Sequence, residues 1–195
     1  MIKKFLVLFF VILKFSVAGM AQSVDQASSK VQSPVTIPLG AQIDYKFFLY
    51  GQTVSISITP QKTNEGILLN WIMKNTSGSY LISNEGLKDG TCINFVQPSP
   101  NKVLKLASNE TFGIISSSAF KMLKSNKTFF YNMTNYTQSQ DIQQLKIGDQ
   151  IVNVIHVIGK EEPTEMWILD NGDLPLICQI KNNPLNINFV MVGFK

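Results

Sequence analysis

Residues 43–60 read IDYKFFLYGQTVSISITP, and their pattern determines the architecture of the chain. Apolar and polar side chains alternate on both sides of Gly51, from Ile43 to Leu49 and again from Val54 to Ile58. A period of two is typical of a β-strand with one buried face, and glycine favours a turn. The segment therefore predicts a β-hairpin that turns at Gly51.

The alternation continues downstream of the hairpin. Leu69, Trp71 and Met73 share one face of the segment 67–74, which predicts a third strand and hence an antiparallel meander. Other apolar, β-branched runs predict further strands at Thr91–Val96, Val103–Ala107, Ile151–Ile158, Glu165–Leu169, Leu176–Ile180 and Ile187–Phe194.

One short helix is expected in the middle of the chain. Serine is a good helix N-cap, and the run Ser116–Ser118 precedes the helix formers of Ala119–Lys124. The segment Asn84–Gly90 predicts a turn or a single helical loop. The predicted fold class is therefore mainly β: an antiparallel sandwich or an open barrel with one short helix.

The sequence Asp170-Asn-Gly-Asp173 lies between two strand-like runs. Asn-Gly favours a type I′ turn, in which both central residues have positive φ, so we predict such a turn at Asn171 and Gly172. The two aspartates resemble part of a calcium loop, but their spacing and the flanking strands favour a hairpin turn.

The N-terminus has the three parts of a secretory signal peptide. Lys3 and Lys4 precede the apolar run Phe5–Leu13, and the small residues Gly19 and Ala21 follow it. The apolar run is shorter than a membrane span requires. We therefore expect three segments along the chain: a signal peptide at 1–21, a flexible, polar lead-in at 22–36 and a single β-rich domain at 37–195. The expected location is the periplasm or the extracellular space, and the processed protein is not expected to be an integral membrane protein.

The charge pattern disfavours a nucleic-acid partner. The formal net charge is +4, but three lysines lie within the predicted signal peptide, so the remainder is close to neutral. All 17 basic residues are lysine. Phosphate recognition commonly uses the bidentate guanidinium of arginine, which this chain lacks.

Two cysteines, Cys92 and Cys178, follow the predicted signal peptide. In an oxidising compartment they can pair as a disulfide, whereas unpaired cysteines are commonly buried. The sequence favours the disulfide slightly and leaves the free thiols as the alternative.

Few residues carry chemistry. His156 is the only histidine, and no nucleophile motif accompanies it, so a hydrogen-bonded strand histidine is favoured over a general base. Two separated cysteines and one histidine cannot make a closed, tetrahedral zinc site without carboxylates, and no phosphate-binding glycine loop is present. The acidic run with Glu161, Glu162 and Glu165 is interpreted as a solvated connection. No catalytic residue, metal site or cofactor is predicted.

Aromatic residues supply the main candidate for ligand binding. Tyr45 and Phe47 fall on one face of the first strand, and Phe48 and Tyr50 fall on the other. Both faces therefore carry large apolar groups. Either the fold covers both of them, or Phe48 and Tyr50 line a groove or cavity.

Parts of the chain resemble a family of exported proteins of unknown function from Bacteroidota-type bacteria. The resemblance covers the C-terminal half, in Gly113–Lys124, Met166–Asn171, Leu174–Ile177 and Asn182–Pro184. It implies a secreted or periplasmic bacterial origin and transfers no catalytic residue.

Three hypotheses for the function follow. The favoured one is a non-enzymatic binding module for a small apolar or amphipathic ligand or an envelope protein. The second is a hydrolase with an uncommon site, and the third is a structural component of the cell envelope. A cavity lined by Phe48 and Tyr50 would favour the first hypothesis, and a cleft containing His156 beside a carboxylate would favour the second.

Overall fold

The computed structural model describes residues 34–97, 99–140 and 144–195. The predicted signal peptide and the lead-in up to residue 33 lie outside the described residues. Within the described part, a single hydrophobic core collects side chains from Ile37 to Met191.

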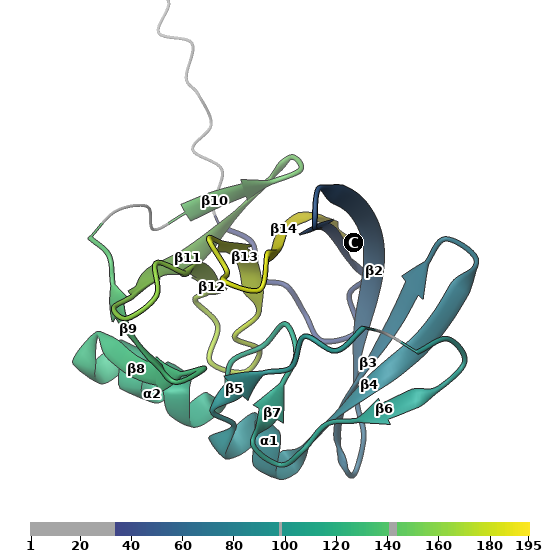
Figure 1. Cartoon of the computed structure of the whole chain (residues 1–195), viewed down its shortest axis with the longest axis horizontal. Helices are drawn as coiled ribbons and strands as arrows, with labels where there is room; N and C mark the ends of the chain where they lie inside the picture. The colour runs from purple at the N-terminus through teal and green to yellow at the C-terminus, as the bar shows by residue number, and fades with distance from the viewer. Residues whose placement is uncertain (1–33, 98, 141–143) are drawn as a thin grey trace, which may run out of the picture. The chain divides into compact units, whose positions relative to one another are not determined.

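The described residues form two helices and a series of short and long strands (Figure 1). The helices are α1 (Asn84–Asp89) and α2 (Ser117–Asn126). The strands are β1 (Ile43–Leu49), β2 (Gln52–Lys62), β3 (Gly66–Met73), β4 (Thr76–Ser83), β5 (Cys92–Ile93), β6 (Val103–Lys105), β7 (Glu110–Thr111), β8 (Thr128–Tyr131), β9 (Thr134–Gln138), β10 (Gln144–Ile147), β11 (Gln150–Gly159), β12 (Glu165–Leu169), β13 (Ile177–Lys181) and β14 (Ile187–Phe194).

Twelve of these strands form one large sheet. Its order is β6-β4-β3-β2-β1-β14-β13-β12-β11-β9-β8, and β10 also pairs with β11. All of its pairings are antiparallel except that of β4 with β6. The sheet is open, because β6 and β8 at its two ends do not pair with each other. A mainly β, antiparallel fold is therefore confirmed.

The predicted hairpin and meander are confirmed as β1, β2 and β3. Tyr45 and Phe47 point into the core, where both contact the ring of Phe189 on β14. Leu69 and Trp71 of β3 are buried as well. The alternation in the sequence thus identifies the core face of these strands correctly.

Strand β11 connects three parts of the sheet. Its first residues pair with β10, its middle with β12 and its last with β9. The backbone of Ile151 in this strand also accepts a hydrogen bond from Val35 N at 2.8 Å. The end of the predicted lead-in is therefore attached to the sheet.

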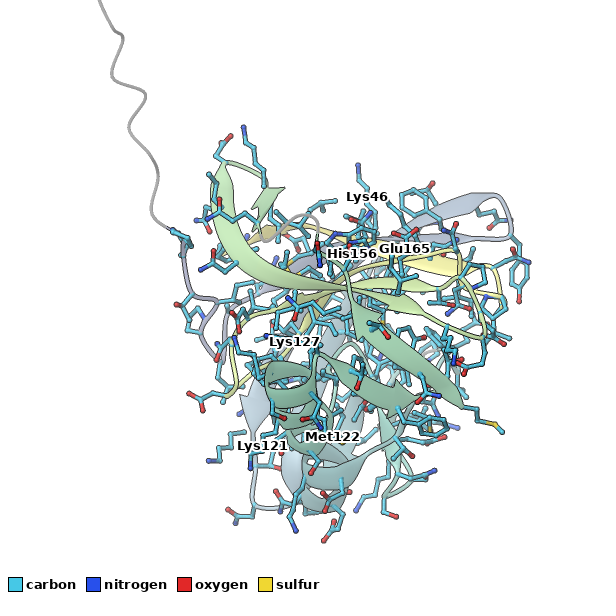
Figure 2. All side chains as sticks on the ribbon, turned by 90° about the vertical axis from the view of Figure 1, so that its left-hand side faces the viewer. Lys46, Lys121, Met122, Lys127, His156 and Glu165 are labelled. Carbon is cyan, nitrogen blue, oxygen red and sulfur yellow. The ribbon has the colours of Figure 1, made fainter. Side chains whose placement is uncertain are left out.

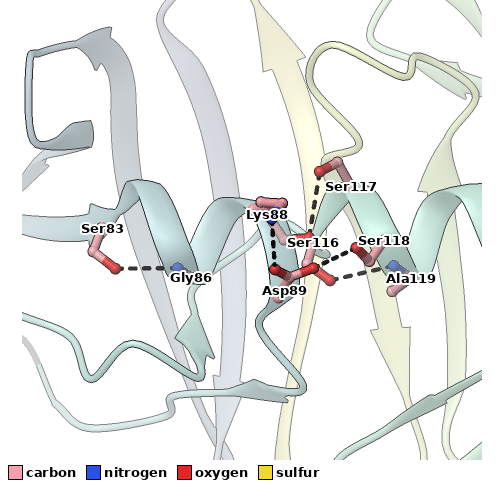
Figure 3. Close-up of polar contacts among 8 residues, drawn as sticks. All are labelled: Ser83, Gly86, Lys88, Asp89, Ser116, Ser117, Ser118 and Ala119. Carbon is pink, nitrogen blue, oxygen red and sulfur yellow. Dashed lines mark hydrogen bonds and ion pairs between the residues drawn. The ribbon is translucent and has the colours of Figure 1, made fainter.

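The two helices meet end to end beside the sheet (Figure 3). Ser116 caps α2 by accepting a hydrogen bond from Ala119 N at 3.3 Å, as the serine run predicts. Ser118 Oγ donates to the Asp89 carboxylate of α1 at 2.6 Å. This bond, supported by Lys88, lowers the pKa of Asp89, which places a stable negative charge near the N-terminus of α2. The expected helix is confirmed, and α1 is a second one.

The predicted type I′ turn at Asn171 and Gly172 is wrong, although β12 and β13 do form a hairpin. Neither residue has positive φ. A longer loop joins the strands, and in it Asn171 Oδ1 accepts from Asp173 N at 3.0 Å. The physical reason is the contact with α2: Asp170 pairs with Lys124 at 2.8 Å, and a Cβ at Gly172 would lie 3.5 Å from the Phe120 ring.

The helix cap generates a first prediction. Ser116→Ala removes the acceptor for Ala119 N and should lower the free energy of unfolding by about 1 kcal/mol in urea titrations. Ser125→Ala, at an exposed position near the other end of α2, should change it by less than about 0.5 kcal/mol. Equal stability of the two variants would contradict the capping role.

Candidate functional site

The candidate site lies on the face of the sheet opposite to the one that carries Tyr45, Phe47 and Phe189, and this face is here called the outer face. It spans the neighbouring strands β1, β14, β13, β12 and β11. Directly paired residues of antiparallel strands share a face, so the strand register places two rows of side chains side by side. One row contains Phe48, Asn188, Lys181, Glu165 and Ile158, and the other contains Lys46, Val190, Gln179, Trp167 and His156.

A hydrogen-bonded pair of His156 and Glu165 lies at one end of this face. The two side chains belong to β11 and β12, and His156 Nε2 lies 2.9 Å from Glu165 Oε2. Asn182 Nδ2 donates to the other carboxylate oxygen at 3.0 Å. These two hydrogen bonds hold the Glu165 carboxylate from two sides. His156, Glu165 and Lys46 occupy the same part of Figure 2, well away from Lys121 and Met122 of α2.

Trp167 connects the pair to its surroundings. Its indole stacks on the His156 ring, with centroids 4.2 Å apart and planes 6° from parallel. Lys181 Nζ lies 4.9 Å from the centroid of the same indole, a cation–π contact. Among the described residues, His156 Nδ1 and Trp167 Nε1 are buried without a hydrogen-bond partner. If the imidazole is neutral and Nε2–H donates to Glu165, Nδ1 is left as an acceptor.

The charge of Lys181 is not compensated by a carboxylate. Lys181 is the direct cross-strand neighbour of Glu165. Glu165 nevertheless bonds to His156 and Asn182, and no described carboxylate lies within 4.0 Å of Lys181 Nζ. The ammonium group is thus available to an anion from outside the fold.

A groove opens beside Lys181. Its volume is about 270 Å³, and it is lined by Phe48, Gln179, Ile180, Lys181, Asn182, Asn188 and Phe189. Ile180 and Phe189 direct their side chains into the core, so the floor of the groove is the backbone of β13 and β14. The Phe48 ring, 43% exposed, forms an apolar wall. The other lining side chains are amides and the ammonium group of Lys181.

The turn beside the groove is held in place by its own asparagines. Asn188 Oδ1 accepts from Asn183 N at 3.1 Å, and Asn183 Oδ1 accepts from Leu185 N at 2.8 Å. Asn182 adopts a positive φ of 55°, which directs the chain into this turn. Asn182 and Asn188 are therefore positioned before any ligand binds, which lowers the entropic cost of binding.

The structure separates the two residues that the sequence analysis proposed for ligand binding. Phe48 lines the groove, whereas Tyr50 lies in the β1–β2 turn and does not. On the core face, Tyr45 and Phe47 border a cavity of only about 10 Å³, which has room for one water molecule at most. The core is therefore filled, and the groove is on the outer face.

The expected disulfide between Cys92 and Cys178 does not form, and both cysteines are free. Cys178 belongs to β13 and is completely buried in the core. Cys92 lies in β5 of the small second sheet, where its thiol donates to the backbone of Asn109 at 3.3 Å. The second alternative, free thiols, is what the structure contains.

Two residues of the acidic run, Glu161 and Glu165, have structural partners. Among the described residues, no cluster of three or more potential metal ligands is found. Glu161 accepts hydrogen bonds from the backbone and side chain of Asn135. Glu165, interpreted from sequence as part of a solvated run, is instead central to the outer-face network. Lys181, Asn182 and Trp167 were also not singled out, because only the strand register brings them together.

No family model matches the chain, and no curated protein matches it significantly. The resemblance to exported Bacteroidota-type proteins therefore stays a prediction. No helix in the described ranges is long and apolar enough to cross a membrane.

The cysteine environments generate a second prediction. Burial raises the pKa of Cys178 to about 12, and partial burial, together with Glu110, raises that of Cys92. Ellman's reagent at pH 8 should therefore modify Cys92 slowly and leave Cys178 unmodified in folded protein, because the thiolate is the reactive form. In denatured, unreduced protein both thiols should react with the reagent. If neither reacted, the cysteines would be paired after all.

Proposed function

We propose that this protein is a non-enzymatic binding module whose outer-face groove takes an amphipathic ligand with an anionic head group. The observation that carries this proposal is that Phe48 and the uncompensated ammonium group of Lys181 line the same groove. An apolar surface next to an available positive charge matches the two ends of such a ligand.

The groove supplies a partner for each part of the ligand. Lys181 Nζ attracts the anionic head, and the amides of Asn188 and Gln179 can donate hydrogen bonds to its oxygens. Phe48 packs against the first carbons of the tail. With a volume of about 270 Å³, the groove has room for the head and the start of a chain.

An exported location fits this function and belongs to the same proposal. Its support is the order of the basic, apolar and small residues in 1–21. A binding module in the periplasm or outside the cell would meet amphipathic anions such as free fatty acids and detergent-like metabolites.

One observation favours the hydrolase as a second candidate function. His156 lies within hydrogen-bond distance of Glu165, as an acid–base pair requires. The imidazole is only 6% exposed, however, and neither residue lines the groove. Binding without catalysis is therefore the better-supported function. Hydrolysis of p-nitrophenyl esters that disappears in His156→Gln would reverse this preference.

The ligand hypothesis generates a third prediction. Decanoate should bind the purified protein in isothermal titration calorimetry, and decyltrimethylammonium, which has the same tail length and the opposite charge, should bind much more weakly. Lys181→Gln and Phe48→Ala should each weaken decanoate binding by about three- to tenfold, because they remove the charge and the apolar wall respectively.

Two variants control for nonspecific effects. Lys46→Gln removes one positive charge from the same face, and Tyr50→Ala removes an exposed aromatic ring from the same strand end, but neither residue lines the groove. Both should bind decanoate like the unmodified protein. Equal losses in Lys46→Gln and Lys181→Gln would show general charge attraction and refute the proposed groove.

A further inference from the structure

Several hairpin turns lie at the same end of the large sheet. Because neighbouring strands run antiparallel, the β1–β2, β13–β14, β11–β12 and β8–β9 turns all follow strands that run in one direction. The first turn consists of Tyr50 and Gly51, and the last consists of Asn132 and Met133. Strands are about 4.8 Å apart, so these two turns are separated by up to ~29 Å along the sheet.

The turns at this end carry the most exposed large apolar side chains among the described residues. Met133 is 87% exposed and Tyr50 is 77% exposed. Leu185, in the β13–β14 turn between them, is 53% exposed. Neither Tyr50 nor Met133 takes part in a hydrogen bond or ring contact with another described residue. The fold gains nothing visible from these two side chains.

Both residues also occupy unfavourable backbone conformations. Tyr50 has φ 48° and its partner Gly51 has φ 82°, whereas Asn132 has φ 49° and Met133 has φ 60°. Positive φ at both central positions is the type I′ pattern, in which asparagine and glycine are preferred. Asn132 also has a structural role, since its side chain accepts from Ile93 N at 2.7 Å. Tyr50 and Met133 are strained with no such compensation, a combination that marks functional positions.

We propose that this end of the sheet docks on the surface of a lipid bilayer, with Tyr50, Leu185 and Met133 inserting at the interface. Single apolar side chains on separate turns suit a flat, fluid surface, which accepts them at any spacing. A protein partner would instead need a matching pocket for each one. Tyrosine is suited to the bilayer interface because its ring is apolar and its hydroxyl stays hydrated.

The charges at this end suit a neutral bilayer. The β3–β4 turn, which follows a strand that runs in the same direction as β1, adds Lys74 to this end. The other turns and the adjoining strand ends carry Lys160 and Lys181 together with Glu161, Glu162 and Glu165, so the two signs balance. Zwitterionic lipid is therefore sufficient, and binding should depend little on salt. This surface is independent of the ligand proposed for the groove, since Tyr50, Met133 and Leu185 do not line it.

The test uses substitutions that should move stability and membrane binding in opposite directions. Tyr50→Asn and Met133→Gly each convert the turn into an Asn-Gly pair, the preferred type I′ sequence. Each should raise the midpoint of thermal unfolding. Each should also lower the partitioning of the protein onto sucrose-loaded phosphatidylcholine vesicles by about three- to tenfold, and the double variant should lose more than either single variant.

A matched control removes exposed apolar surface elsewhere. Ile72, 57% exposed in β3, lies within a strand, and Ile72→Thr should leave partitioning unchanged. The proposal is overturned if the double variant partitions like the unmodified protein. It is overturned equally if Ile72→Thr reduces partitioning as much as the double variant does. It is also overturned if the unmodified protein forms dimers that the double variant abolishes while vesicles bind neither, because the turns would then contact a second copy. A lower unfolding midpoint in Tyr50→Asn and Met133→Gly would show that the side chains serve the fold.

Discussion

The pairing of β14 with β1 is the contact on which the rest of the structure depends. β1 begins one meander, β1 to β4, and β14 ends another, β11 to β14. Their pairing, which runs from Ile43↔Phe194 to Leu49↔Ile187, joins the two meanders into one sheet. On the core side it brings Phe189 between Tyr45 and Phe47, and on the outer side it places Phe48 beside Asn188. The core and the groove are therefore two faces of the same junction.

On the outer face, the hydrogen bonds of the Glu165 carboxylate determine which contacts are left for Lys181. Glu165 has Lys181 as its cross-strand partner, and a salt bridge would be the simple outcome. His156 and Asn182 occupy its oxygens instead, and Lys181 lies over Trp167. A surface salt bridge would stabilise the fold by about 0–1 kcal/mol. The observed arrangement forgoes that small gain and leaves a positive charge beside an apolar wall.

The sequence predicts well what depends on local pattern. The alternation in β1, β2 and β14 and the serine cap of α2 identify these elements, because burial and capping are decided within a few residues. The strand β4 is not predicted: its TSGSYLIS sequence begins with small polar residues that pair with β3 at positions where bulk is excluded. There, a Cβ at Gly78 would come within 2.6 Å of the Trp71 ring.

What depends on long-range contacts could not be predicted from the sequence. The Asn171-Gly172 pair has the best local turn signal, yet packing against α2 gives it another conformation, and type I′ φ values occur at Tyr50-Gly51 and Asn132-Met133. The candidate site could not be predicted from the sequence for a similar reason. Phe48 lies on β1, far in sequence from the β12–β13 hairpin that carries Glu165 and Lys181, and only the register across β14 and β13 makes them neighbours. Whether Cys92 and Cys178 can pair likewise depends on the sheet that each one joins. Cys92 lies in the small sheet and Cys178 in the large one.

The junction also determines the order in which the protein can assemble during synthesis. A ribosome delivers β1 long before β14, and until residues 187–194 emerge one edge of β1 has no partner. An unpaired strand edge is a template for aggregation. The nascent β1–β4 meander presents such an edge at β1, the strand that also carries the apolar side chains of Tyr45 and Phe47. The sheet is therefore complete only once β14 is available, and until then the free edge of β1 must be kept from pairing with other chains.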